Sequence, residues 1–240
     1  MQERKKKILK AIIKEYQRIG QPVSSQLLTE RFHLDFSPAT VRAEMMSLDE
    51  EGFLEQPHVS AGRVPTDKAW RFFLEEEKDD LSSEEKRCIL KRVNKLEREL
   101  LSIKKVAQFL ADCSRSFGVS GIFGRLSDFH EAGFHWLFND FSFDDSLTEF
   151  LKEVDSFEED FSEFFNYLDE PVQIFIGQEN PIKYLRNFSL VVGAFESEIG
   201  RGVLGILGSK RMNYKKNKFV VEQVQKKIKG RSCVNKITLK

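Results

Sequence analysis

The 240-residue sequence predicts an α+β fold made of two modest domains. Helical apolar periodicity dominates the first half, whereas the last third holds short β-branched runs bounded by glycine, which are typical of strands. Within residues 37–68 a helix signal is followed directly by a hairpin signal, the order of a winged helix-turn-helix domain. A hydrophobic content of 40% is sufficient for a packed core.

The first predicted helix covers residues 3–19, because apolar side chains form one face and Lys and Arg fill the other. Gly20 ends this helix. A short second helix follows, and either Ser24 or Ser25 can cap it. The basic cluster at residues 4–7 has two open interpretations, which are contact with phosphate and a solvated helix start.

A third helix is predicted to begin at Ser37, which can act as the N-cap, with Pro38 at the first helical position and Gly52 at the end. Spacing of four and three residues makes one buried stripe of Val41, Met45 and Leu48. The residues that face away are Ala39, Arg42, Ala43 and Met46. Because Ala39 and Ala43 have small side chains, the helix backbone can approach a DNA major groove closely.

A hairpin is predicted after this helix. An apolar pair at residues 53–54 leads into a polar loop that contains Pro57, Gly62 and Pro65. Arg63 stands where the loop returns. A cation on a narrow hairpin can enter the minor groove or pair with a phosphate, so the hairpin is a candidate wing.

These residues resemble the N-terminal domain of the heat-inducible transcription repressors, the HrcA family. The resemblance is carried by Leu54-Glu55-Gln56-Pro57-His58 and by Ser60-Ala61-Gly62-Arg63-Val64-Pro65-Thr66-Asp67-Lys68. The family usually has Asn-Asp after the Arg of the recognition helix, where this chain has Ala43-Glu44. Since Asn is a natural reader of adenine, this difference bears on the operator sequence rather than on DNA binding itself.

One long helix is predicted over residues 83–117, starting with a capping box formed by Ser82 and Glu85. Its apolar seam is Ile89, Val93, Leu96, Leu100, Ile103, Ala107 and Leu110. The seam has two open interpretations, a homodimer coiled coil and packing on the chain's own C-terminal domain.

The C-terminal half is predicted to contain a small sheet. The expected strands are residues 119–126, 172–176, 190–195 and 203–207. A Phe-rich amphipathic helix is expected over residues 157–168, with its aromatic stripe in the core or an interface, and a last helix over residues 213–229. Residues 231–240 are expected to form a loose basic tail.

The resemblance extends to Ile176-Gly177, to Glu179-Asn180-Pro181 and to Gly205–Tyr214, which are similar to the family's GAF-like C-terminal domain. Compared with the family pattern, an inserted dimerisation module is missing between about Leu126 and Phe134. The resemblance therefore implies a reduced, four-stranded GAF-like remnant, and the long helix becomes a candidate for dimerisation. The expected division is a winged-helix domain at 1–76, the long helix at 82–117, the GAF-like domain at 118–230 and the tail at 231–240.

The net charge of zero conceals a segregated distribution. Residues 1–75 are near neutral at +1, residues 76–200 sum to −12 and residues 201–240 to +11. The basic stretch at residues 210–229 could contact DNA or pair with the acidic middle of the same or a partner chain, and the charge asymmetry favours the acidic middle.

Several function classes are disfavoured. The odd, widely spaced set Cys88, Cys113 and Cys233 fits a reducing cytoplasm better than a disulfide framework. Neither a signal peptide nor a membrane-spanning run is expected. No nucleophile motif, metal-ligand spacing or phosphate loop is recognisable, so we expect no enzyme activity, no metal and no cofactor.

The first hypothesis is a cytoplasmic DNA-binding transcriptional repressor that acts as a homodimer. The resemblance implies an inverted-repeat operator of heat-shock (chaperone) genes, release on heat stress and the chaperonin as a partner. The candidate DNA-binding residues are Ser24, Ser25, Ser37, Ala39, Thr40, Arg42, Ala43, His58, Ser60 and Arg63. The alternatives are a ligand-sensing winged-helix regulator of other genes and a protein-interaction module that binds no nucleic acid.

Overall fold

The structure, a computed structural model, describes residues 1–32, 35–77, 81–96, 102–123, 127–141, 145–153, 156–197 and 200–231. The chain divides into two compact units, Met1–Lys78 and Asp79–Lys240. Helices combine with an antiparallel sheet, which confirms the predicted α+β class. Among the described helices, none has the length and apolar character needed to cross a membrane.

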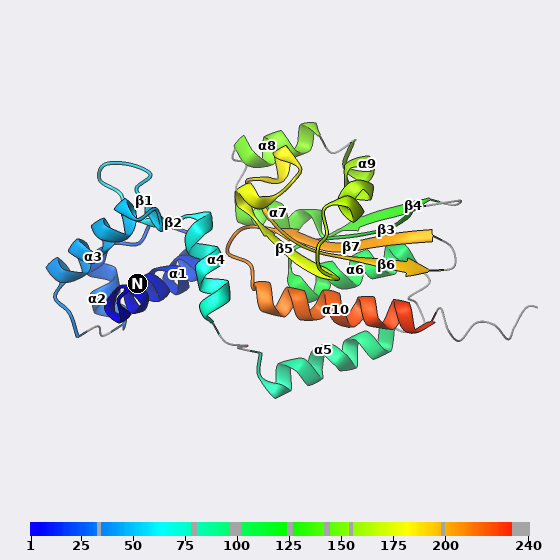
Figure 1. The fold of residues 1–240 in the computed structure, drawn as a ribbon, viewed down its shortest axis with the longest axis horizontal. Coiled ribbons are helices and arrows are strands. Elements are labelled where there is room, and N and C mark those ends of the chain that lie inside the picture. The colour runs from blue at the N-terminus through cyan, green and yellow to red at the C-terminus, as the bar shows by residue number, and fades with distance from the viewer. Residues whose placement is uncertain are drawn as a thin grey trace, which may run out of the picture. The chain divides into compact units, whose positions relative to one another are not determined.

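The first unit contains three helices, a small two-stranded antiparallel sheet and a fourth helix (Figure 1). These elements are α1 (Glu3–Ile19), α2 (Ser25–Phe32), α3 (Pro38–Glu50), β1 (Leu54–Glu55), β2 (Val64–Pro65) and α4 (Asp67–Glu76). The predicted bounds of the first helix are confirmed, and Gly20 ends it in the left-handed conformation. The core is formed by one face of each helix, including Ile8, Leu9, Ile12, Leu28, Val41, Leu48 and Trp70.

The second unit is a five-stranded antiparallel sheet with helices on both faces (Figure 1). Its helices are α5 (Ser83–Leu96), α6 (Ile103–Ser114), α7 (Phe134–Phe141), α8 (Asp145–Lys152), α9 (Phe157–Ser162) and α10 (Tyr214–Arg231), with 3-10 turns η3 (Glu163–Asn166), η4 (Gly177–Glu179) and η5 (Lys183–Leu185). Its strands are β3 (Phe117–Phe123), β4 (Asp128–Ala132), β5 (Val172–Ile176), β6 (Ser189–Ser197) and β7 (Gly200–Gly208). The spatial order of the strands is β4-β3-β7-β6-β5.

Two layers of helices sandwich this sheet. Helices α6 and α10 pack on one face, and α5 contacts both of them from outside. Helices α7, α8 and α9 lie on the other face (Figure 1). Gly118 on β3 permits the close approach of α6, because a Cβ there would lie 2.4 Å from the carbonyl oxygen of Ala107.

The prediction of one helix over residues 83–117 is wrong. Two helices occupy this stretch, because Ser102 has an extended backbone with φ −96° and ψ 106°. The second helix then ends at Ser114, since Arg115 adopts the left-handed conformation and Phe117 begins β3. Within these helices the seam residues Ile89, Val93, Leu96, Ile103, Ala107 and Leu110 are buried in their own unit. Leu100 lies outside the described residues.

Burial of this seam bears on dimerisation. Both α5 and α6 use their apolar faces against elements of the same chain, namely each other, α10 and the sheet. A heptad-like spacing is also what a helix needs to pack on one side, so the pattern alone could not separate the two interpretations. The burial favours the second interpretation, in which the seam packs on the chain's own C-terminal domain.

The prediction of four strands is also wrong, because β4 adds a fifth that pairs with β3. β4 lies at the edge of the sheet and its side chains are exposed or half-buried, so its polar sequence lacks the apolar signal used to recognise strands. The strand falls in the region where the resemblance implies a missing module. Strands β5, β6 and β7 contain the predicted runs, although β6 and β7 extend further. The strand predicted over residues 119–126 begins earlier, at Phe117, and its last three residues lie outside the described residues. Of the predicted tail, Arg231 ends α10, and residues 232–240 lie outside the described residues.

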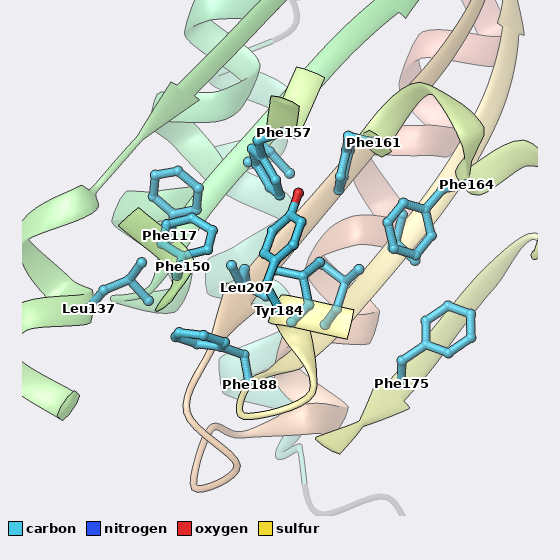
Figure 2. Close-up of a cluster of buried hydrophobic side chains, with 14 of the residues drawn as sticks. Phe117, Leu137, Phe150, Phe157, Phe161, Phe164, Phe175, Tyr184, Phe188 and Leu207 are labelled. Carbon is cyan, nitrogen blue, oxygen red and sulfur yellow. The ribbon is translucent and has the colours of Figure 1, made fainter. Parts of the chain in front are cut away.

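A cluster of aromatic side chains fills the space between the sheet and α7–α9 (Figure 2). Its fully or nearly fully buried rings include Phe117, Phe150, Phe157, Phe161, Phe164, Phe175 and Phe188. The predicted helix over residues 157–168 is replaced by α9 and η3, but its aromatic stripe does lie in the core. Gly205 on β7 allows the ring of Phe161 to lie against the strand, since a Cβ there would be 3.0 Å from its Cζ.

We predict that Phe161→Ala destabilises the second unit by about 3–5 kcal/mol. Its ring is fully buried and its centroid lies 5.4 Å from that of Phe157 and 5.2 Å from that of Phe164. Chemical denaturation followed by circular dichroism measures the change. Leu151→Ala is the control, because Leu151 is 39% exposed and its loss should change stability by no more than about 0.5 kcal/mol. Equal unfolding midpoints for the two variants would contradict the assigned core.

Candidate nucleic-acid interface

Helix α3 presents one apolar and one solvent-exposed face. The predicted N-cap is confirmed, because Ser37 Oγ accepts a hydrogen bond from the Thr40 amide at 3.2 Å. The stripe of Val41, Met45 and Leu48 is buried. The outward residues Ala39, Arg42, Ala43 and Met46 are all exposed. Arg42 forms no ion pair with another described residue, so its guanidinium is available to an external anion.

Ion pairs attach α3 to the first helix. Glu44 is 7% exposed and accepts a hydrogen bond from Arg4 Nε at 2.6 Å. Lys5 pairs with Glu51 and donates to Ser47 Oγ at 2.8 Å. Three cations of the predicted basic cluster are thus engaged within their own unit, since Lys6 also lies 3.2 Å from a carboxylate oxygen of Glu76 on α4.

A second ion-pair cluster joins α1 and α2. The carboxylate of Glu15 is 1% exposed and accepts a hydrogen bond from Arg18 Nη2 at 2.6 Å. Arg31 Nε on α2 lies 2.9 Å from its other oxygen. The hydrogen bond from Arg18 is the main cause that lowers the pKa of Glu15 below its ordinary value of 4.5; the positive charges of Arg18 and Arg31 add to it, and burial opposes it.

The hairpin is docked at its base against the strand-like residue Val23. Val23 and Arg63 exchange two backbone hydrogen bonds of 2.9 Å each. The adjacent Gly62 must be glycine, because a Cβ would lie 2.4 Å from the carbonyl carbon of Val23. The loop itself is closed by Gln56, whose Nε2 donates to the carbonyls of Val59 at 2.8 Å and Ala61 at 3.0 Å.

Arg63 lies at this base rather than at the tip of the hairpin. Its Nε is 2.9 Å from Asp49 Oδ2 near the end of α3, an ion pair rather than an aligned hydrogen bond, and its side chain is 15% exposed. The sequence predicted that Arg63 stands where the loop returns, but it could not identify Asp49 as the partner of Arg63. The exposed tip carries His58, Val59 and Ser60, and Val59 is 98% exposed.

A groove of about 350 Å³ separates the start of α2, the outward side of α3 and the hairpin. Of the candidate residues it brings together Ser24, Ser25, Arg42, Ser60 and Arg63. Ser24 Oγ also accepts a hydrogen bond from the Leu27 amide at 3.2 Å, which identifies it as the cap of α2. The candidates that do not line the groove are Ser37, Ala39, Thr40, Ala43 and His58.

The groove also contains residues that sequence reasoning did not select. Met46, which is 53% exposed, was visible on the outward helical face but was not chosen as a site residue. Gln56 and Val59 carry no recognisable sequence signal. Gln56 closes the loop through its hydrogen bonds, and Val59 lies at the tip of the loop. Among the described residues, no group of three or more His, Cys, Asp or Glu could hold a metal ion.

Comparison with known proteins shows to which class of proteins this chain is similar. The chain is 46% identical over 109 residues to a heat-inducible transcription repressor of Natranaerobius thermophilus, and 41% identical over 117 residues to that of Moorella thermoacetica. These matches cover 45% and 48% of this chain, but only 31% and 32% of the relatives, so the chain spans about a third of their length. Its relatives are therefore heat-inducible transcription repressors.

The family model described as the HrcA protein C-terminal domain matches residues 70–217. The chain belongs to the HrcA family, as its motifs predicted. A crystal structure of a hypothetical protein, solved at 2.2 Å, shares the fold with a TM-score of 0.75 and 18% identity. That match covers 97% of this chain and 100% of the other.

We predict that Gly62→Ala destabilises the first unit by about 1–3 kcal/mol. The added Cβ would lie 2.4 Å from Val23 backbone atoms, so the hydrogen bonds between Val23 and Arg63 must lengthen or break. Amide hydrogen exchange at residues 23 and 63 measures this directly. Gly52→Ala serves for comparison, because a Cβ there meets nothing within 4 Å and only its φ of +75° is strained. Unchanged protection in Gly62→Ala would contradict the docked hairpin.

Acid should weaken the first unit through Glu15. A carboxyl with a depressed folded pKa stabilises the fold above its ordinary pKa of 4.5, and this contribution disappears as the pH falls through the folded pKa. The unfolding free energy should therefore fall below pH 4.5, and Glu15→Gln should flatten this decline. Denaturation at a series of pH values, with the exposed Glu30→Gln as control, measures it. Parallel pH profiles for wild type and Glu15→Gln would refute the assignment.

Proposed function

We propose that the first unit is a winged helix-turn-helix and that the chain is a DNA-binding transcriptional repressor of heat-shock genes. The observation that carries the proposal is the groove in which α2, the exposed face of α3 and the hairpin bring five candidate residues together. That arrangement suits a recognition helix with a wing beside it. The names of the relatives support a heat-inducible repressor.

Helix α3 is the proposed reader of the major groove. Arg42 can pair bidentately with a guanine or with a phosphate, because its guanidinium is exposed and has no partner among the described residues. Ala39 and Ala43 allow close approach of the helix backbone, and Thr40 with Ser37 contributes short polar groups at its start. With Ala43 at the position usually held by Asn, reading of adenine is lost there, so the operator differs from the usual family target at the matching base.

The remaining candidate residues have supporting roles. Ser24 and Ser25, at the start of α2, are proposed to hold a backbone phosphate. His58 and Ser60 are proposed to contact DNA from the exposed hairpin tip. Arg63 is proposed to act chiefly as a positioning residue, since its ion pair with Asp49 sets the hairpin against the end of α3.

Binding as a homodimer to an inverted repeat follows from the same proposal, because two α3 helices read two half-sites. Since the seam of α5 and α6 is buried in its own unit, we propose that this dimer uses another surface. We propose that the second unit is GAF-like, as its five-stranded antiparallel sheet between helical layers suggests.

Heat would release the repressor when unfolding of the second unit dissolves the dimer, since the second DNA contact is then no longer intramolecular. A chaperonin partner and a cytoplasmic location are implied by the family resemblance.

A ligand-sensing regulator was the alternative. Such a protein needs a pocket on its sheet, and here the face toward α7–α9 is packed with the aromatic cluster (Figure 2). This packing supports the heat-released repressor over the ligand-sensing one.

We predict that Arg42→Ala weakens binding to the operator by roughly 10- to 100-fold, about 1–3 kcal/mol, because a bidentate contact is lost. The operator duplex is first selected from random DNA with the wild-type chain. A gel shift then compares the operator with a scrambled duplex at fixed salt.

Arg42→Lys is the matched control, because it keeps the charge but not the planar fork. It should retain binding to the scrambled duplex while losing preference for the operator. Wild-type affinity in Arg42→Ala would exclude α3 as the reading helix.

A further inference from the structure

The outer helical layer of the second unit is strongly basic. α5 carries five Lys and Arg against two Glu, and α10 carries seven against one. The opposite face of the sheet carries the acidic helices, with α9 alone contributing Glu158, Glu159 and Asp160 (Figure 1). The sheet therefore lies between the basic helices and the acidic helices.

The basic layer makes ion pairs at some positions and leaves other cations exposed. Lys218 of α10 lies 3.4 Å from Glu170, which precedes β5. On α5, in contrast, Arg87, Lys91 and Lys95 are exposed and form no ion pair with another described residue. These three cations of α5 are therefore available to an external anion.

These three cations form one stripe. The inner face of α5 buries Ile89, Val93 and Leu96. On its outer face an open hollow of about 710 Å³ is lined by Arg87, Leu90, Lys91, Asn94 and Lys95. Successive cations four residues apart lie about 6 Å from each other along a helix. This spacing is close to twice the axial distance of about 3.4 Å per phosphate of one DNA strand.

Most of the positive charge of the first unit is balanced by its own acidic residues. Residues 1–75 carry 12 Lys and Arg against 11 Asp and Glu. Arg4, Lys5 and Lys6 are engaged by Glu44, Glu51 and Glu76. Affinity for DNA depends on cations that neutralise phosphates, so cations from the second unit would add to the few that the first unit offers.

We propose that the outward face of α5 is a second, sequence-independent contact for the DNA phosphate backbone. This inference rests on the proposed function, because it takes DNA as the target. It assigns specificity to α3 and a large share of the salt-dependent affinity to α5.

The test is a salt titration of the full chain on a fluorescent random-sequence duplex, read by anisotropy. Lys91→Gln/Lys95→Gln should lower the magnitude of the slope of log Kd against log salt by about 1.8 per bound copy, since each phosphate contact contributes about 0.9. Lys152→Gln/Lys183→Gln is the matched control. It removes the same charge from α8 and η5, on the acidic side of the sheet, and should leave the slope unchanged.

The outcomes separate this inference from the function on which it rests. Equal slopes for Lys91→Gln/Lys95→Gln and wild type, with wild-type binding intact, would overturn the α5 contact alone. Absence of any wild-type binding to DNA would overturn both. Equal slopes accompanied by loss of a salt-sensitive oligomer in analytical ultracentrifugation would assign the stripe to a second copy of this chain and overturn the DNA contact.

Discussion

The ion pairs made by the carboxylates of α3 determine which face of that helix remains open. Glu44 and Glu51 attach α3 to Arg4 and Lys5 of α1, while Asp49 engages Arg63 at the base of the hairpin. Two carboxylates of the helix, those of Glu44 and Asp49, are thereby directed toward protein cations, while Glu50 is exposed at its end. Its outward face is left with small side chains, a methionine and one available cation, which is the composition that an approach to DNA requires.

The same contacts explain the shape of the groove. The hairpin cannot move freely, because backbone hydrogen bonds hold Arg63 to Val23 and the absence of a side chain at Gly62 permits that approach. The start of α2, the face of α3 and the hairpin therefore present a largely preformed surface. A preformed surface loses less conformational freedom on binding, which favours affinity.

Much of this arrangement could be predicted from local signals. Ser37 and Pro38 mark the start of α3, and the spacing of Val41, Met45 and Leu48 identifies its inner face. The partners of Glu44 and Arg63 could not be predicted, because they come from segments distant in sequence. The helix break at Ser102 was missed because the apolar period continues across it, and β4 was missed because an edge strand needs few apolar residues. Helical spacing predicted that the aromatic stripe from Phe157 lies in the core or an interface, and the structure places it in the core.

The central claim is that this chain reads DNA in a sequence-specific manner through two copies of α3. The most direct test is to measure the affinity of the wild-type chain for three duplexes at one salt concentration: the selected inverted repeat, a single half-site and a scrambled sequence. The account predicts tight binding to the full repeat, much weaker binding to the half-site and the weakest binding to the scrambled duplex, because only the full repeat engages both helices. Equal affinity for all three duplexes would contradict it.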